Sequence, residues 1–301
     1  MIIDLTGFDA KTGFCDRLWQ VSFCATIADL REDRTLFFLE VPSIWFQSRI
    51  ADILNIQGFE IKTWNESLGT AEYRLKSSNS YPCLENVKQL KPPDPGMSDE
   101  SFLALWLSMY KRFSPRKDIR KKVESIGADR ECIGLHIRFT DKINENPFPW
   151  EIHPGELKQV EQRTIHAIQA ALKNSNLKRV YLATDCSKAR VSWKNKLESW
   201  GATVLLNSYA VYDENQFRQT SGEDFLIDLF SLARCRQIVG SINSGIPFTA
   251  ARIGGLDENE IVLGRYATKL RRVARELRKR SRLANLFIAG VKRLKVSIIK
   301  S

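Results

Sequence analysis

Residues 133–142 read Ile-Gly-Leu-His-Ile-Arg-Phe-Thr-Asp-Lys, an apolar run that ends in charged and polar side chains. This pattern predicts a buried strand that brings its last side chains to the edge of a sheet. Open α/β sheets bind ligands outside the carboxyl ends of their strands. Arg138 has a planar set of donors suited to phosphate, and Lys142 adds a mobile positive charge. The alternative is an ordinary strand whose end is solvated and paired internally.

Strand-like and helix-like segments alternate along most of the chain. The expected strands are Met1–Leu5, Thr35–Val41, Phe59–Trp64, Cys132–Arg138, Lys178–Ala183, Thr203–Leu206, Gln237–Val239 and Ile261–Leu263. The expected helices are Asp16–Leu30, Ile44–Ile56, one capped by Ser98, Pro154–Lys173, Ser187–Trp200, Glu223–Cys235 and Ile246–Gly254. Such alternation predicts parallel sheets covered by helices. The length of 301 residues suits two α/β domains, which we expect to be joined near Ser114–Asp129.

The net charge of +11 is concentrated at the end of the chain. Residues 267–301 contain twelve Lys or Arg and one acid, Glu276, whereas residues 1–266 contain 34 bases and 34 acids. Leu270, Val273 and Leu277 recur there at helical spacing, which is typical of a basic amphipathic helix on an anionic membrane surface. A closing helix with solvated charges is the alternative. Nucleic acid is the least favoured partner, because the excess of basic residues is confined to this segment and the rest of the chain is formally neutral.

The cysteines and histidines show neither a disulfide framework nor metal-ligand spacing. The six cysteines form no Cys-x-x-Cys pair and lie within apolar or helical patterns. No apolar run reaches the roughly 18–20 residues that span a bilayer, and the first residues lack the pattern of a secretory signal. We therefore expect a cytoplasmic protein with reduced cysteines and no bound metal, held at the inner face of the membrane if the basic tail binds lipid.

Two further strand ends should lie at the same sheet edge as Arg138, because parallel strands point the same way. Thr184-Asp185 follows one strand, and Ser241-Ile-Asn-Ser244 lies between another strand and a short helix. Backbone N–H groups at the start of a helix favour an anion. Asp228 lies in an otherwise apolar helical stretch, where a single acid needs a partner. It is either a helix cap or internal ion pair, or a carboxylate that binds a base or sugar.

Together these segments resemble the α1,6-fucosyltransferase superfamily, which includes the core fucosyltransferase and the rhizobial chitin-oligosaccharide fucosyltransferase. The matching segments are His136–Lys142, Val180–Asp185, Asp228–Cys235, Ser241–Ser244 and, more weakly, Gly13–Leu18. They occur in the family's order and extend through most of residues 1–255.

The resemblance implies a GT-B fold with two Rossmann-type α/β domains. Residues 1–125 would form the acceptor-side domain, residues 126–266 the domain that binds the nucleotide sugar, and residues 267–301 a basic helical tail. The implied donor is GDP-fucose, bound without a metal. The implied donor-binding residues are His136, Arg138, Asp141, Lys142, Asp185, Asp228, Ser241 and Ser244.

The implied reaction is inverting transfer of fucose to a hydroxyl of a glycan or glycolipid. Arg138 would stabilise the charge that grows on the leaving diphosphate. Glu145 is the nearest candidate for an acidic general base, although it lies one residue off the family spacing and can equally be a solvated loop acid. Phe139 replaces a frequent second arginine, and Cys186 and Cys15 replace an acid and a glycine. Because of these departures, two alternatives remain. The protein is a glycosyltransferase that uses another nucleotide sugar, or a non-catalytic nucleotide- or glycan-binding protein of the same fold.

Overall fold

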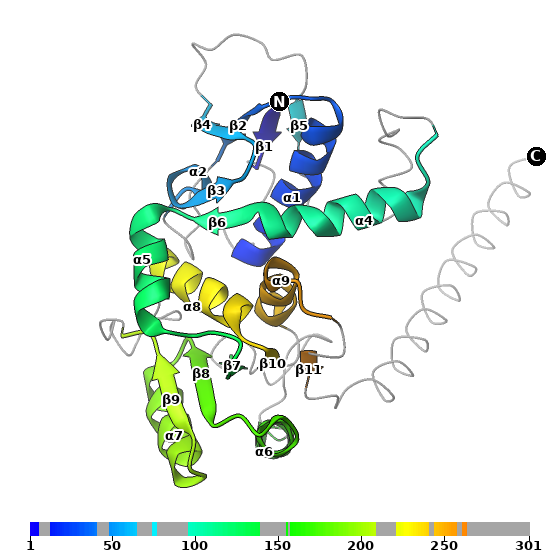
Figure 1. Cartoon of the computed structure of the whole chain (residues 1–301). Coiled ribbons are helices and arrows are strands. Elements are labelled where there is room, and N and C mark those ends of the chain that lie inside the picture. Colours follow the sequence, from blue (N-terminus) through cyan, green and yellow to red (C-terminus); the bar gives the residue numbers. More distant parts are fainter. Residues whose placement is uncertain are drawn as a thin grey trace, which may run out of the picture.

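A computed structural model describes residues 1–5, 13–40, 48–64, 74–76, 96–138, 155, 157–208, 221–240, 244–257 and 261–263. These residues form two parallel sheets with helices packed on them (Figure 1). Within the same ranges, no helix combines the length and apolar character needed to cross a membrane.

The first sheet has the strand order β4-β2-β1-β5, and all its strands are parallel. Its strands are β1 (Ile2–Asp4), β2 (Thr35–Leu39), β4 (Glu60–Thr63) and β5 (Arg74–Lys76). Helix α1 (Phe14–Leu30) connects β1 to β2 and packs against α4 (Asp99–Met109). The expected cap is confirmed, because the Ser98 side chain accepts a hydrogen bond from the Ser101 backbone N–H at 3.2 Å.

The second sheet has the strand order β11-β10-β7-β8-β9 and is also parallel. Its strands are β7 (Cys132–Ile137), β8 (Arg179–Thr184), β9 (Thr203–Leu206), β10 (Gln237–Gly240) and β11 (Ile261–Leu263). Its helices are α6 (Leu157–Ser175), α7 (Ser187–Ser199), α8 (Gly222–Arg234) and α9 (Gly245–Gly254). The chain moves outward from β7 through β8 and β9, then returns to the other side through β10. The strand order therefore reverses between β7 and β10, as in doubly wound folds.

The central strand β7 presents different residues to the two faces of its sheet. Ile133 and Ile137 belong to the core that α6 and α7 cover. Gly134 faces α8, since a Cβ built there would lie 2.8 Å from Cδ2 of Leu232. Side chains alternate along a strand, so His136 lies on the same side as Gly134, toward α8.

The two sheets share one apolar core. It includes residues of β1, β2, α1 and α4 together with residues of α8 and α9, and Figure 1 shows α8 and α9 between the sheets. Phe14 of α1 makes an edge contact with Phe225 of α8, with ring centroids 5.2 Å apart. The Arg252 guanidinium of α9 lies 4.6 Å from the ring centre of Trp19 in α1. Helix α9 is thereby fixed against the first sheet's helices.

The expected helix Ile44–Ile56 is wrong at its C-terminal end. Only α2 (Ile50–Ile53) is helical in the described part, and Leu54–Ile56 forms strand β3. This strand pairs in antiparallel fashion with β6 (Phe113–Pro115), almost sixty residues later in the chain. A three-residue strand depends on its partner more than on local propensity, so a local pattern does not reveal it.

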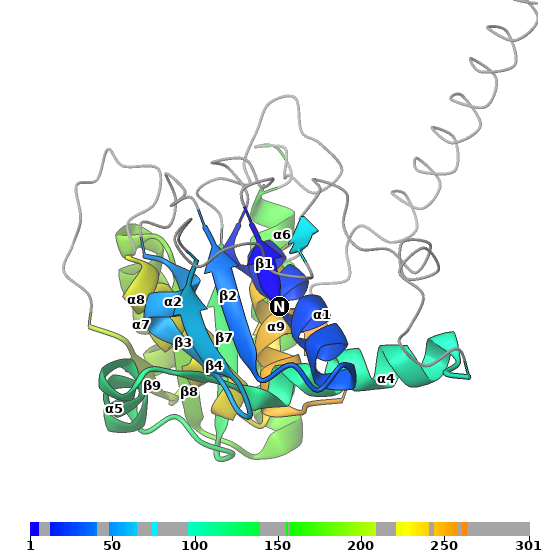
Figure 2. The same ribbon diagram turned by 90° about the horizontal axis from the view of Figure 1, so that it is seen from above.

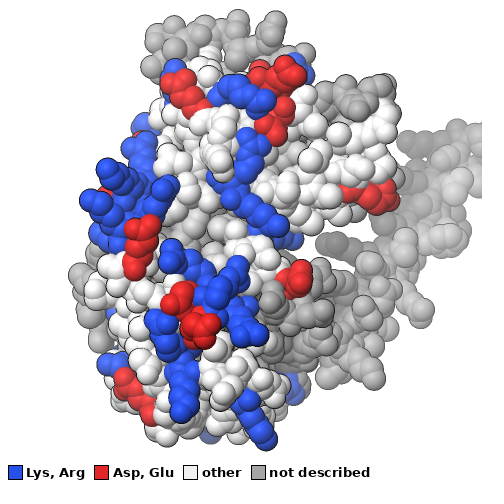
Figure 3. Space-filling model, in the orientation of Figure 1, with Lys and Arg blue, Asp and Glu red and all other residues white. Residues whose placement is uncertain are grey.

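The expected linker Ser114–Asp129 is largely helical. Helix α5 (Lys117–Ile126) occupies most of it and ends at Gly127, whose φ of 74° is left-handed. Ile119 and Val123 are buried, and α5 packs along α8. Figure 2 shows α4 and α5 at one side of the molecule. Lys117, Arg120 and Lys121 of α5 are exposed, and Figure 3 shows Lys and Arg side chains gathered over this helix.

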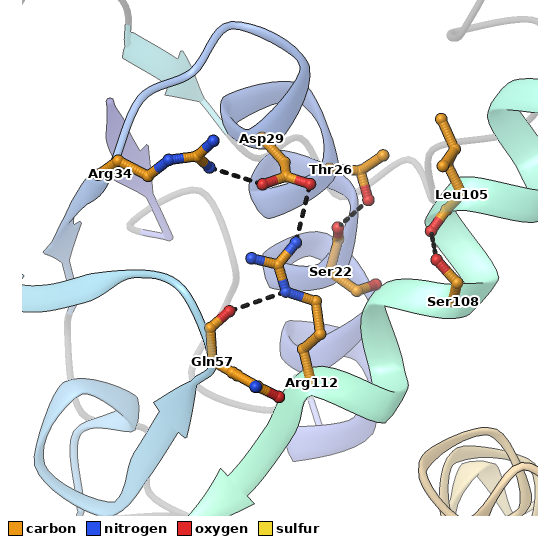
Figure 4. A network of polar contacts seen from close by, with 8 residues as sticks. All are labelled: Ser22, Thr26, Asp29, Arg34, Gln57, Leu105, Ser108 and Arg112. Carbon is orange, nitrogen blue, oxygen red and sulfur yellow. Dashed lines mark hydrogen bonds and ion pairs between the residues drawn. The ribbon is translucent and has the colours of Figure 1, made fainter.

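A polar network joins the end of α1 to neighbouring segments (Figure 4). The Asp29 carboxylate accepts hydrogen bonds from Arg34 at 2.7 Å and from Arg112 at 2.8 Å. Arg112 lies in the short 3-10 helix η2 (Tyr110–Arg112) and also donates through Nε to the Gln57 carbonyl oxygen. One carboxylate thus holds together α1, the start of β2 and the segment that leads into β6.

Candidate functional site

Three strand ends meet at the carboxyl edge of the second sheet. Strand β7 lies between β8 and β10, and His136 pairs in register with Ala183 on one side and Gly240 on the other. Arg138 follows β7 directly, and Asp185 follows β8. The convergence expected from the sequence is therefore confirmed for these residues. This edge includes the β7–β10 position where the strand order reverses, which is where doubly wound folds bind their ligands.

Arg138 and Asp185 form an ion pair across this edge. The distance from Arg138 Nε to Asp185 Oδ2 is 3.9 Å, and the side chains are only 14% and 16% exposed. The contact uses Nε of a guanidinium that carries five N–H donors in a planar fork. The carboxylate therefore orients the arginine beside the switch point of the sheet, in a setting where solvent screens charge only in part.

The start of α9 lies at the same switch point. Buried Ser244 caps this helix, and its hydroxyl accepts a hydrogen bond from the Ile246 backbone N–H at 3.4 Å. A Cβ built at Gly245 would lie 3.0 Å from Cβ of Cys15, in the first turn of α1. The N-termini of α1 and α9 therefore meet, and glycine at 245 permits this close approach. The partial positive charge of a helix start suits a phosphate group.

Asp228 lies in the second turn of α8 and is buried. Its Oδ1 accepts a hydrogen bond from the hydroxyl of Tyr181, a wholly buried residue of β8, at 2.5 Å. The helix-cap interpretation is wrong, because Ser221 caps α8 and accepts from the Asp224 backbone N–H. The buried acid is held by a tyrosine hydroxyl, which keeps it in place on the face of β7 and β8 that also carries His136.

Charged residues at the carboxyl edge of the first sheet were not predicted as site residues, although Arg17 lies in the matching segment Gly13–Leu18. Asp4 ends β1 and Arg17 lies in the first turns of α1, and both are buried. Glu40 follows β2 and accepts hydrogen bonds from the Ile50 and Ala51 backbone N–H groups at 2.9 and 3.1 Å. Burial raises the pKa of Glu40, and these two bonds and the nearby Arg17 offset the rise only in part. Glu40 could have been found from the sequence, because it is an acid that directly follows an apolar strand.

The remaining predicted site residues lie outside the described residues. They are Asp141, Lys142, Glu145 and Ser241, together with the departure at Phe139 and the basic tail 267–301. Within the described ranges, no three or more His, Cys, Asp or Glu side chains gather in a way that could hold a metal ion.

No protein-family model matches the sequence. Among solved structures, POFUT1 in complex with GDP-fucose is similar with a TM-score of 0.51 and 11% identity, covering 88% of this chain and 98% of that one. A POFUT1 complex with GDP has a TM-score of 0.50 and 10% identity, with the same two coverages. The fucosyltransferase NodZ from Bradyrhizobium shares 17% identity at a TM-score of 0.46, covering 83% of this chain and 92% of NodZ. The chain thus has the α/β fold of the GT-B fucosyltransferase structures.

Proposed function

We propose that the protein is a glycosyltransferase that transfers fucose from GDP-fucose to a hydroxyl of a glycan or glycolipid. The observation that carries this proposal is the carboxyl edge of the second sheet, where Arg138 and the start of α9 lie beside the β7–β10 switch point. Both features suit a diphosphate. POFUT1, whose fold is similar, has been solved with GDP-fucose bound.

Charge development explains how this edge would act in catalysis. As the acceptor hydroxyl attacks the anomeric carbon, the bond to GDP breaks and negative charge grows on the diphosphate. Arg138, oriented by Asp185, and the N–H groups at the start of α9 would stabilise that charge in the transition state. Inversion at the anomeric carbon follows from a single displacement. Glu145 stays the candidate for the base that takes the acceptor proton.

A donor screen tests the proposal. Purified protein is incubated with GDP-fucose, GDP-mannose, UDP-glucose and UDP-galactose, and the released nucleoside diphosphate is measured with and without mixed glycan acceptors. We expect acceptor-dependent release from GDP-fucose. If the nucleoside diphosphate is instead released from another donor, that donor's sugar is the one transferred and not fucose. A raised melting temperature with GDP and no release from any donor would indicate a non-catalytic nucleotide-binding protein.

We also propose a cytoplasmic location, with residues 267–301 at an anionic membrane surface. The twelve Lys or Arg and single acid of this segment support the idea, since each cation near such a surface contributes about 1 kcal/mol. The full chain should co-sediment with vesicles that contain phosphatidylglycerol, and a chain ending at residue 266 should not. Equal sedimentation of both would refute a role for the tail, and tighter binding to duplex DNA than to vesicles would favour nucleic acid.

A further inference from the structure

Helix α9 connects the candidate donor site to the helices of the first sheet. At its first turn, a Cβ added at Gly245 would lie 3.0 Å from Cβ of Cys15, in the first turn of α1. Its last turn contains Arg252, whose guanidinium contacts α1 again at Trp19. The start of α1 therefore borders the donor site, and the contacts along α9 determine where α1 lies.

The Arg252 guanidinium lies against two aromatic rings of the first sheet's helices. Its central carbon is 4.6 Å from the ring centre of Trp19 in α1 and 5.4 Å from that of Tyr110 in η2. Both distances are within the roughly 6 Å at which an aromatic face attracts a cation. Tyr110 is buried, and Trp19 packs edge-on against Trp106 of α4, with ring centroids 5.0 Å apart. The two rings that receive the cation are therefore held firmly by their own neighbours.

Further contacts hold α9 to the second sheet. A Cβ added at Gly254 would lie 2.1 Å from the Ala233 carbonyl oxygen, so the ends of α9 and α8 pack backbone against backbone. The Arg130 guanidinium donates to the Cys235 carbonyl oxygen at 2.8 Å and to the Gly254 carbonyl oxygen at 2.7 Å. Helix α9 is thus fixed to α8 and the second sheet, and Arg252 joins it to the rings of the first sheet's helices.

We propose that Arg252 is a positioning residue for sugar transfer, because its contact with Trp19 and Tyr110 sets where α1 lies beside the donor site. This inference rests on the proposed function. Arg252 lies seven residues after Gly245, about 10 Å further along the helix, so it acts on the site only through α9 and α1. Displacing reacting groups by about 1 Å can lower a rate about 100-fold. A changed contact between α1 and α9 therefore acts on transfer, whereas the nucleotide is held by the second sheet and binds as before.

Arg252→Met tests the proposal, because it keeps an unbranched side chain and removes the charge. The affinity for GDP is measured by calorimetry on the full chain, and kcat and donor KM are measured in acceptor-dependent transfer. We expect kcat to fall about 10-fold, while the GDP dissociation constant and donor KM stay within about twofold. Arg252→Lys keeps a cation over the rings and should retain kcat within about threefold.

Lys196→Met is the matched control. Lys196 of α7 also places its charge over an aromatic ring, 4.8 Å from the ring centre of Trp193, on the side of the second sheet away from α9. Loss of this contact should lower the melting temperature and leave kcat unchanged. A merely structural role for Arg252 would give the same pattern, with a lower melting temperature and a wild-type kcat.

Trp19→Leu removes one of the rings and tests the same contact from the α1 side. It should lower kcat as Arg252→Met does, and the double variant should lose no more than the stronger single change. The proposal is overturned if either folded single variant keeps the wild-type kcat, if Arg252→Lys loses as much as Arg252→Met, or if GDP affinity falls together with kcat. Wild-type protein that transfers sugar from no donor would instead refute the proposed function, and this inference with it.

Discussion

The two parallel sheets use the charged residues at their carboxyl edges differently. At the first edge, Asp4 and Arg17 are buried, and Glu40 accepts hydrogen bonds from the backbone N–H groups of α2. At the second edge, Arg138 and Asp185 form a longer contact and keep 14% and 16% of their side-chain surface exposed. Charges at the first edge thus stabilise the chain itself. Charges at the second edge remain accessible to a ligand.

Arg138→Ala should have the largest effect, and on activity rather than stability. Loss of the cation removes stabilisation of the leaving diphosphate, so kcat/KM should fall by about 100-fold or more, the usual cost of losing one preorganised donor. The melting temperature should change little. Arg236→Ala is the matched control, because this exposed arginine precedes β10 at the opposite edge of the same sheet. Activity of Arg138→Ala within threefold of wild type would refute the contrast between the edges.

Gly254→Ala should have the largest effect on stability. A Cβ at this position would lie 2.1 Å from the carbonyl oxygen of Ala233, so the backbones of α8 and α9 must separate. We expect the free energy of unfolding to fall by about 3 kcal/mol, the upper range for overpacking, in urea titrations. In Gly134→Ala the closest contact, at 2.8 Å, is with the end of the movable Leu232 side chain, and the next, at 3.4 Å, is with Cys235 Sγ, so this change should cost less. Equal losses in the two variants would show that the helix–helix approach at Gly254 is not rigid.

Glu40→Gln tests the structural role of the first edge. A glutamine accepts a hydrogen bond through only one of its two terminal atoms, so one backbone N–H of α2 loses its partner. The free energy of unfolding should fall by about 1 kcal/mol, as for loss of a helix cap, while donor kcat/KM stays within twofold. A drop in transfer comparable to that of Arg138→Ala, with normal stability, would assign the first edge a direct part in the reaction.

The second sheet was more predictable from the sequence than the first. Its strands are apolar runs bounded by glycine or charged residues, and Thr203–Leu206 and Ile261–Leu263 occur at the predicted bounds. Its helices cover a buried sheet and show clear apolar periodicity. The first sheet includes β5, a three-residue strand that the sequence did not predict and that pairs with distant β1. The separate two-stranded sheet of β3 and β6 likewise pairs distant segments, which local patterns do not encode.

The site could be predicted only where a side chain follows a strand directly. Arg138 and Asp185 were found in this way because parallel strands share an edge. The Tyr181 hydroxyl was not identified, because tyrosine within an apolar strand is typical of a core position. Its partner Asp228 was recognised as a buried acid, but the element that satisfies it is 47 residues away in the chain. Polar contacts between a strand and a helix require the tertiary structure.

Of the four main changes, Asp29→Asn should have the smallest effect, which is present at neutral pH and disappears in acid. Burial raises the pKa of Asp29, but hydrogen bonds from Arg112 and Arg34 outweigh it and hold the pKa below its usual value. A depressed folded-state pKa contributes stability above the unfolded value, near pH 4, that is lost as the pH falls through the folded value.

The Asp29 side chain is 38% exposed, so solvent screening limits the contribution to less than about 1 kcal/mol. Asp129→Asn is the matched change beside the second sheet. Burial raises the pKa of Asp129, but hydrogen bonds, first among them that from Arg179, outweigh burial and lower it. Asp129 is 45% exposed and pairs with one arginine, whereas Asp29 pairs with two, so its loss should matter less. Acid titrations of unfolding in which Asp29→Asn and wild type lose stability in parallel would show that the network in Figure 4 adds nothing to the first sheet's stability.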